Sequence, residues 1–141
     1  MTAHRSDAPV IRIVAAVIVD SAGRVLLVRK RGTDAFMLPG GKRAAGEDTL
    51  EALARELDEE LGCGIAPGPR PLGTFRAAAA NEPGAIVEAE LFAVETIGGI
   101  SPAGEIEEAL WHDPDSTPAL RLAPLAREHV LPLVRSRRSA A

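Results

Sequence analysis

Apolar residues gather in runs and stripes that predict strands and helices along the chain. The run from Val10 to Val19 is apolar and rich in β-branched residues, which is typical of a strand buried on both faces. Residues 20–23 have the composition of a turn, and the run from Arg24 to Lys30 follows as a second strand. The pattern therefore predicts a hairpin near the start of the chain.

The clearest helical signal lies between Asp48 and Gly62. Asp48, followed three residues later by Glu51, resembles a capping box and places the start of a helix near Thr49. Gly62 is suited to end the helix in a left-handed conformation. Between these caps, apolar residues recur at helical spacing and predict one buried stripe, made of Leu50, Leu53, Ala54, Leu57 and Leu61.

The second half of the chain predicts further strands and a C-terminal helix. Residues 72–80 and 86–94 read as antiparallel partners around a turn. We expect Trp111 to anchor the core rather than to stack on a base. An amphipathic helix is expected over residues 123–134, and Pro132 is expected to kink it or cut it short.

Length and composition fit one globular domain. The chain has 141 residues, 46% of them hydrophobic, which is enough for one core. We expect the domain to span residues 10–134, with flexible tails at residues 1–9 and 135–141. The first nine residues have no apolar core, so no signal peptide is predicted, and the run from Val10 to Val19 is too short to cross a bilayer.

Charge and the content of cysteine and histidine narrow the function classes. A net charge of −4 argues against binding of duplex nucleic acid, which normally requires a basic face. A single cysteine, Cys63, cannot form an internal disulfide, which predicts a reducing, cytoplasmic compartment. We expect Cys63 to be a buried helix-end residue. His4, His112 and His129 lack metal-ligand spacing, so structural or solvated roles are expected for them.

Three acids gather on one flank of the predicted helix. At 100° per residue, Glu56, Glu59 and Glu60 fall together at positions i, i+3 and i+4. Two carboxylates about 6 Å apart repel each other by about 0.7 kcal/mol in water and about 3 kcal/mol at an effective dielectric constant of about 20. From spacing alone, the acids are either a solvated charged face or ligands of a hard divalent cation such as Mg²⁺.

The stretch from Gly41 to Cys63 resembles the Nudix box, the signature of the Nudix hydrolase family. It reads Gly41, five residues, Glu47, seven residues and then RELDEELGC, which ends at Cys63. Every fixed position of the signature matches except the last, where Cys63 replaces an aliphatic residue. The preceding Leu38–Lys42 run, LPGGK, is similar to the usual lead-in of the family. A match of so many residue types in one register is highly specific.

The resemblance implies an α/β fold, a Nudix-type α/β/α sandwich with a mixed β-sheet. By matching position, it implies that Glu56, Glu59 and Glu60 bind Mg²⁺ or Mn²⁺ and that a backbone carbonyl at Gly40 completes the metal shell. The remaining box positions have supporting roles by the same match: Arg55 orients the carboxylates, Glu47 braces the box, and Gly41 and Gly62 shape it. Glu105 is a candidate general base or further metal ligand, and the alternative is an acid in a solvated turn.

Four further residues are candidates for contact with the substrate. Strand alternation sends Arg29 and Lys30 to opposite sides, and Arg29 is expected to face the substrate; the alternative is an edge-strand charge that keeps the sheet soluble. Lys42 is a candidate for contact with phosphate and Arg76 for contact with the substrate. Asn81 is the candidate for contact with a base or sugar.

The resemblance implies hydrolysis of a nucleoside diphosphate linked to another moiety. Nucleoside triphosphates, nucleotide sugars, ADP-ribose and dinucleoside polyphosphates all remain open as substrates. A nucleotide-binding sensor that has lost catalysis is the alternative from another class. The isomerase branch of the superfamily is a third possibility. That branch requires a catalytic cysteine, and Cys63 is wrongly placed for this role. The resemblance is also compatible with a homodimer.

Overall fold

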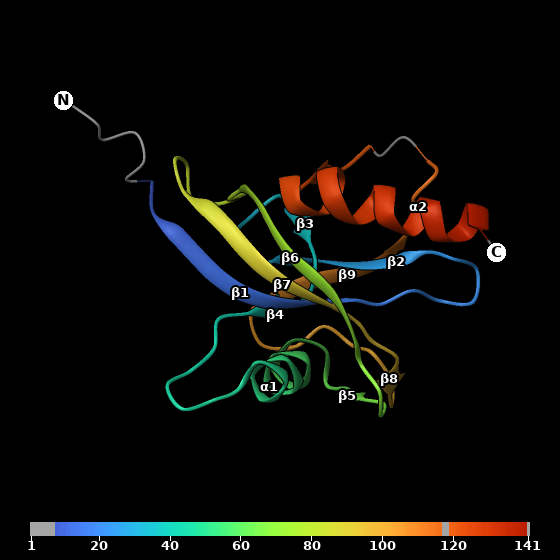
Figure 1. Cartoon of the computed structure of the whole chain (residues 1–141), viewed down its shortest axis with the longest axis horizontal. Helices are drawn as coiled ribbons and strands as arrows, with labels where there is room; N and C mark the ends of the chain where they lie inside the picture. The colour runs from blue at the N-terminus through green and yellow to red at the C-terminus, as the bar shows by residue number, and fades with distance from the viewer. Residues whose placement is uncertain (1–7, 117–118, 141) are drawn as a thin grey trace.

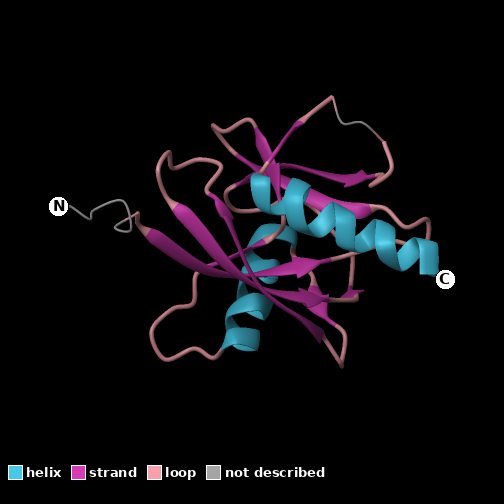
Figure 2. Ribbon diagram, turned by 45° about the horizontal axis from the view of Figure 1, so that its top comes forward, coloured by secondary structure: helices cyan, strands magenta, loops and turns pink. Residues whose placement is uncertain are grey.

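The computed structural model describes residues 8–116 and 119–140, with side chains up to residue 137 in the last helix. These residues form three layers, in which two β-sheets lie between helix α1 (Thr49–Leu61) and the C-terminal helix α2 (Leu131–Ala140) (Figures 1 and 2). His4 and most of the predicted N-terminal tail lie outside the described residues. The predicted α/β/α sandwich with mixed sheets is confirmed.

Each of the two main sheets has four strands and mixes parallel with antiparallel neighbours. The first has the order β4-β1-β7-β6, with β1 parallel to β7. Its strands are β1 (Val10–Val17), β4 (Gly40–Gly41), β6 (Arg70–Ala78) and β7 (Ile86–Ala93). The second has the order β10-β3-β2-β9, with β10 parallel to β3. Its strands are β2 (Val25–Lys30), β3 (Ala35–Met37), β9 (Ile106–His112) and β10 (Arg121–Leu122). A short ribbon pairs β5 (Gly64–Ile65) with β8 (Thr96–Ile97).

The predicted hairpin of the first two strands is wrong beyond its turn. The strands β1 and β2 belong to different sheets and meet only at an isolated bridge between Val19 and Val25. Instead, β1 pairs along its whole length with β7, from Val10 opposite Ile86 to Val17 opposite Ala93. A strand that is apolar on both faces can pair with distant segments as well as with its neighbour, so its sequence does not identify its partner.

Helix α1 begins and ends where the caps predict. The Asp48 side chain accepts from the Glu51 backbone N–H and the Glu51 side chain accepts from the Asp48 backbone N–H, while Gly62 adopts φ 66°. The predicted apolar stripe is right at its centre and wrong at its edge, because Leu50 and Ala54 are exposed. The buried face is instead centred on Leu53, Leu57 and Leu61 and also includes Ala52 and Glu60. The burial of Glu60 brings one of the acids to the core side of the helix.

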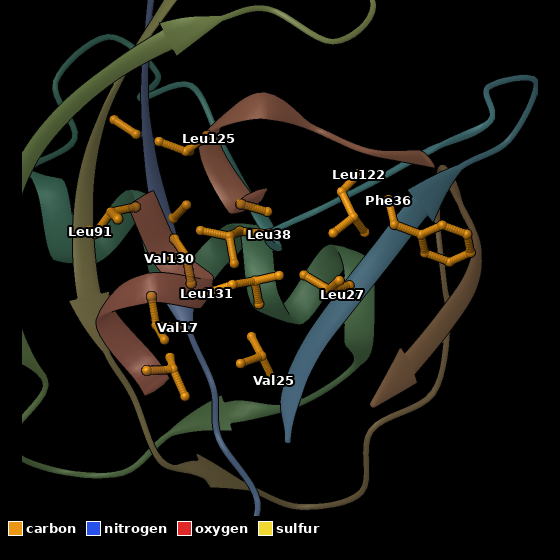
Figure 3. Packing of buried hydrophobic residues seen from close by; sticks show 14 of the residues in the cluster. Val17, Val25, Leu27, Phe36, Leu38, Leu91, Leu122, Leu125, Val130 and Leu131 are labelled. Carbon is orange, nitrogen blue, oxygen red and sulfur yellow. The ribbon is translucent and has the colours of Figure 1, made fainter. Parts of the chain in front are cut away.

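Alternate residues of β1 and β2 pack toward opposite helices. Ala15 and Val17 join Val25 and Leu27 in the cluster that packs against the C-terminal helix (Figure 3). The intervening residues of both strands pack in a second cluster against α1, which contains Val14, Ala16, Ile18, Leu26, Val28, Leu53, Leu57 and Leu61. In these two strands, the even-numbered core residues therefore face α1 and the odd-numbered core residues face the C-terminal helix.

The C-terminal helix continues through Pro132. A π-helical segment, η2 (Ala126–Val130), runs directly into α2, and the Leu131 N–H donates to the Ala126 carbonyl. The prediction that Pro132 cuts the helix short is wrong, and residues 135–140, expected as part of a tail, are helical. The wider π turn lies just before Pro132 and accommodates a residue that has no N–H.

Two residues flagged from the sequence lie in the core cluster beside α1. Cys63 is 3% exposed, and burial raises the pKa of its thiol, as expected for a structural cysteine. Trp111 is half-buried and packs against the same cluster, in keeping with the expected anchoring role. Among the described residues, no helix has the length and apolarity that spanning a bilayer requires.

Candidate active site

A cleft of about 530 Å³ is lined by residues of helix α1 and of both main sheets. Its charged lining residues, called its charged end below, include Glu56 and Glu60 of α1, Lys30 and Glu105. Its apolar lining residues, called its apolar wall below, include Ile11, Ile13, Val28, Met37 and Val87. Gly40, Gly41, Lys42 and residues 79–82 complete most of the lining. One concave surface thus combines carboxylates, an ammonium group and an apolar wall.

The two glycines of strand β4 allow close approach of β1 on one side and of α1 on the other. A Cβ atom on Gly41 would lie 2.5 Å from the carboxylate carbon of Glu56. A Cβ atom on Gly40, which has φ 152°, would collide with the backbone of Val14 and Ala15. The missing side chains therefore have two different uses, since Gly40 permits strand packing and Gly41 leaves the space that the Glu56 carboxylate occupies.

Glu60 is the most strongly perturbed carboxyl group of the cleft. It is 7% exposed, and its Oε1 accepts a hydrogen bond from the Gly40 N–H at 3.2 Å. Burial, together with the neighbouring Glu56, raises the pKa of Glu60 to about 8 against the lowering effects of Gly40 and Lys30. Ionising two adjacent carboxyl groups at the same time is energetically unfavourable, the more so when one of them is buried. The pair therefore favours a shared proton or a cation.

Glu59, the third acid of the predicted patch, is more exposed than this pair and shares a partner, Arg55, with Glu56. Its side chain is 54% exposed, and both of its carboxylate oxygens lie 3.3 Å from Arg55 Nη1. Arg55 also lies 3.2 Å from Glu56 Oε2 and donates to the Lys42 carbonyl. Arg55 therefore contacts two of the three acids, in keeping with the orienting role that the resemblance implied.

Glu47 braces Arg55 from the opposite side. Its carboxylate accepts two hydrogen bonds from Arg55, at 2.6 Å and 2.9 Å, and one from the Ala44 N–H at 2.7 Å. The bonds from Arg55, followed by that from Ala44, lower the pKa of Glu47 to about 2. The hydrogen bond between Arg55 and Glu47 in turn raises the pKa of the Arg55 guanidinium. The loop before α1 is thereby tied to the middle of the helix.

The donor set fits a hard divalent cation at the Glu56 and Glu60 pair. Two oxygen ligands meet there, the Gly41 position leaves room, and a cation would relieve the repulsion between the carboxylates. Glu59, the third acid of the set predicted from the sequence, does not line the cleft and, like Glu56, contacts Arg55. Within residues 8–116 and 119–137, no group of three or more His, Cys, Asp or Glu side chains is arranged to hold a metal ion. The backbone carbonyl of Gly40 as a ligand stays a prediction.

Of the last two residues of β2, Lys30 lines the cleft and Arg29 does not. Lys30 has the same parity as Leu26 and Val28, which pack toward α1, and it lines the charged end. Arg29 has the other parity: it pairs with Glu108 at 3.2 Å, donates to the Thr33 carbonyl and lies 5.9 Å from the centre of the Phe36 ring. The structure thus corrects the expectation that Arg29 faces the substrate and assigns it the alternative, a strand charge with protein partners.

The other candidate substrate contacts divide in the same way. Lys42 and Asn81 line the cleft, and the segment before Asn81 is held by Arg121, which donates to the Ala80 carbonyl at 3.0 Å. Arg76 does not line it, because its guanidinium pairs with Glu88 at 2.6 Å and lowers the pKa of that carboxyl. The expected substrate contact of Arg76 is therefore not supported by its position.

Glu105 lies at the edge of the cleft, as the candidate base or ligand requires. The apolar wall, Arg31 and Thr33 line the same space, and no pattern in the sequence pointed to them as site residues. Strand parity could have identified Lys30 if the face covered by α1 had been known. Of the described histidines, neither lines the cleft: His129 contacts the Arg76 carbonyl at 2.9 Å, and His112 is buried.

Comparison with known proteins identifies the class to which this fold and cleft belong. A family profile described as NUDIX domain matches residues 9–134. An ADP-ribose pyrophosphatase of Methanocaldococcus jannaschii is 30% identical over 107 residues, 73% of this chain and 62% of that protein. An RNA pyrophosphohydrolase of Halorhodospira halophila is 47% identical over 53 residues, 38% of this chain and 29% of that protein. The chain thus spans less than two thirds of the length of either curated relative.

A solved structure shares this fold. The solution structure of the E. coli ORF135 protein superimposes with a TM-score of 0.72 at 27% identity, covering 96% of this chain and 95% of that chain. The two named relatives are hydrolases of phosphoric anhydride bonds. The chain belongs to the Nudix hydrolase family, which confirms the resemblance carried by residues 41–63.

Proposed function

We propose that this protein is a divalent-metal-dependent pyrophosphohydrolase that cleaves a phosphoric anhydride bond in a nucleotide-type substrate. The observation that carries the proposal is that charged residues, Glu56 and Glu60 among them, and apolar residues line the same cleft. A nucleoside diphosphate linked to another group combines the same two kinds of surface, in its charged phosphates and its flat, largely apolar base. The match in chemistry supports this substrate class over a wholly apolar or wholly anionic ligand.

Each part of the cleft has a task in this reaction. The ammonium groups of Lys30 and Lys42 would hold phosphate oxygens, and Asn81 would contact the base or sugar. Glu105 would accept the proton of the attacking water, for which its exposed carboxylate at the edge of the cleft is suited. Fixing water and phosphate in one geometry supplies much of the rate enhancement in such reactions.

The metal would be held by Glu56 and Glu60, with Glu59 and the Gly40 carbonyl as the further ligands implied by the family signature. When bound, Mg²⁺ or Mn²⁺ neutralises phosphate oxygens and lowers the pKa of a coordinated water. Arg55 and Glu47 would act indirectly, because their ion pair fixes the direction of the Glu56 side chain.

The burial of Glu60 favours catalysis over a nucleotide-binding sensor. Burying a carboxyl group beside a second carboxylate is unfavourable for folding unless a proton or a cation offsets it. A protein that bound nucleotides without a metal ion would gain nothing from this arrangement. The isomerase alternative has no support from Cys63, which is buried beside α1 and does not line the cleft.

The cleft indicates the type of reaction more clearly than the identity of the substrate. Its lining contains no aromatic residue, so a base would pack on Ile11, Ile13, Val87 and Met37 rather than stack on a ring. The named activities of the two curated relatives make ADP-ribose and the 5′-triphosphate end of RNA the first candidates to test. The cytoplasmic location and the homodimer stay predictions.

The test is a substrate panel with purified protein. Nucleoside triphosphates, ADP-ribose, nucleotide sugars, dinucleoside polyphosphates and 5′-triphosphorylated RNA are incubated with Mg²⁺, with Mn²⁺ and with excess EDTA. We expect release of a phosphate-containing product from at least one substrate with either metal, and none with EDTA. Nucleotide binding without turnover under every metal condition would support the sensor instead, and undiminished turnover after exhaustive chelation would refute the metal dependence.

A further inference from the structure

The turn that carries Glu105 is fastened to the C-terminal end of α1. The Ser101 N–H donates to the Leu61 carbonyl at 3.0 Å, and the Ala103 N–H donates to the Glu60 carbonyl at 2.9 Å. The last carbonyls of a helix have no partner within the helix, so these two bonds satisfy groups that would otherwise need water or a cap. The turn and the helix that carries Glu56 and Glu60 are therefore docked directly on each other.

Gly104 makes this docking possible. It has φ 57°, and a Cβ atom at this position would lie 2.9 Å from the backbone oxygen of Glu59. Any other L-residue would meet both the left-handed conformation and the backbone of α1. The turn thus lies against the helix at backbone distance, one residue before Glu105.

Arg31 holds the same turn from the other side through three contacts. Its backbone N–H donates to the Glu105 carbonyl at 2.8 Å, and its Nη1 donates to the Gly104 carbonyl at 3.1 Å. Its Nε donates to Glu107 Oε1, also at 3.1 Å. A single residue of the segment after β2 therefore contacts residues before, at and after the candidate base.

A register shift in the sheet explains why Glu107 is available to Arg31. Along β2 and β9, Arg29 is opposite Glu108 but Lys30 is opposite Ile106, which leaves Glu107 as an extra residue in β9. Such bulges bend a strand and redirect side chains, and they are frequent beside active sites. Here the bulge follows Glu105 directly and presents the Glu107 carboxylate to the Arg31 guanidinium.

We propose that Arg31 is a positioning residue that holds the turn of residues 104–107 so that Glu105 is presented to the cleft. Within the described part of the chain, the Glu105 side chain has no hydrogen-bond or ion-pair partner of its own, so its backbone sets its direction. The backbone is held by α1 on one side and by Arg31 on the other. The catalytic part of this inference rests on the proposed function, whereas the holding of the turn does not.

The geometry of the contacts requires arginine. The guanidinium fork spans the Gly104 carbonyl and the Glu107 carboxylate at the same time, which the single ammonium group of lysine cannot reproduce. In Arg31→Ala both side-chain contacts are lost, and the backbone bond from residue 31 to the Glu105 carbonyl is kept. Since the Arg31 side chain is 62% exposed, its loss should loosen the turn without unfolding the domain.

The first test measures the turn itself, by amide hydrogen exchange in the metal-free protein. The Ala103 and Ile106 amides are the probes, because each donates a hydrogen bond within or from the turn. In Arg31→Ala we expect their exchange to be roughly tenfold faster, with α1 unchanged, and in Arg31→Lys an intermediate increase. Arg29→Ala is the matched control, since it removes a comparable ion pair outside the cleft and should leave both probes unchanged. Unchanged exchange of both probes in Arg31→Ala would overturn the proposal.

The second test asks whether Arg31 acts through Glu105. On a substrate found in the panel, Arg31→Ala should lower kcat roughly ten- to a hundredfold in the wild-type background and have little further effect when Glu105→Gln is already present. Equal fold losses in the two backgrounds would show that Arg31 acts elsewhere. A wild-type protein that turned over none of the panel would refute the proposed function, and the exchange result would then decide by itself whether Arg31 holds the turn.

Discussion

The carboxylate of Glu60 accepts a hydrogen bond from the backbone N–H of Gly40, 3.2 Å away. This contact joins the buried side of α1 to strand β4, at the point where the cleft has its charged end. A glutamine in place of Glu60 keeps an oxygen that can accept the same bond and removes the charge. The substitution therefore separates the structural role of residue 60 from its chemical role.

We expect Glu60→Gln to lower turnover roughly a hundredfold and to raise the stability of the metal-free protein. Turnover falls because a neutral amide is a poor ligand for a hard cation. Stability rises because repulsion with Glu56 and the cost of burying a carboxyl group are removed, by about 1 kcal/mol or roughly 3 °C in Tm. Kinetics with Mg²⁺ and thermal unfolding in EDTA at pH 7.5 measure the two effects. A variant with wild-type turnover would contradict the assignment of Glu60.

Substitutions at the two neighbouring glycines should have different effects. In Gly41→Ala the new Cβ meets the end of the flexible Glu56 side chain, which can move, so we expect a Tm near that of the wild type and at least a roughly tenfold loss of turnover. In Gly40→Ala the new Cβ meets the backbone of β1, which cannot move cheaply, so we expect a clear fall in Tm. Thermal unfolding and steady-state kinetics of both variants provide the comparison.

Gly99→Ala is the control for the glycine series. A Cβ at that position has no neighbour within 4 Å, and its φ lies outside the left-handed range. Both Tm and turnover should therefore match those of the wild type. A similar loss of turnover in Gly41→Ala and Gly99→Ala would show that the space occupied by Glu56 is not critical.

Lys30 and Arg29 are adjacent in sequence and should respond differently to truncation. We expect Lys30→Ala to raise KM roughly tenfold with little change in Tm, because an ammonium group that holds phosphate is lost from the cleft. Arg29→Ala removes the contacts with Glu108, Thr33 and Phe36, so its main effect should be a fall in stability of about 1 kcal/mol. A rise in KM for Arg29→Ala that equalled the rise for Lys30→Ala would contradict this separation.

The ion pair of Glu47 and Arg55 should stabilise the protein only above a defined pH. The folded state lowers the pKa of Glu47 from 4.5 to about 2, so this group binds fewer protons in the folded than in the unfolded state at intermediate pH. Its stabilising contribution is complete above pH 4.5 and is lost as the pH falls toward 2. We therefore expect the difference in stability between wild type and Glu47→Gln to be constant near neutral pH and to shrink over that range.

Denaturant unfolding at a series of pH values measures this difference. Glu51→Gln is a useful comparison, because Glu51 contacts the helix N-cap backbone and not Arg55. A stability difference for Glu47→Gln that was independent of pH down to 2 would show that the carboxylate of Glu47 is not specifically stabilised by its partners.

The local features of α1 could be predicted from the sequence, because their causes are local. Asp48, Glu51 and Gly62 act within one or two turns of the helix, and their roles are confirmed. The arrangement of the acids could be predicted only in part. Helical spacing places Glu59 beside Glu56 and Glu60 and also one turn after Arg55, so side-chain rotamers decide which of these neighbours it contacts.

The features that depend on long-range contacts could not be predicted from the pattern. Strand alternation showed that Arg29 and Lys30 point to opposite sides, but the side that faces the cleft depends on where α1 packs. The pairing of β1 with β7 rather than with β2 could not be predicted for the same reason, since the sequence of an apolar strand does not identify its partner. The turn around Glu105 depends on α1 and on Arg31, which is far away in the sequence.

The π turn before Pro132 keeps the last helix in phase with the core. Leu125 and Val130 are five residues apart, as are Ala126 and Leu131, and all four are buried. In a regular α-helix, residues five apart point about 140° away from each other, so one residue of each pair would turn away from the core. The helix thus accommodates one residue more than an α-helical turn would allow. A deletion of one residue in this segment could therefore be tolerated as a regular α-helix, whereas a further insertion would rotate Val134 out of the core.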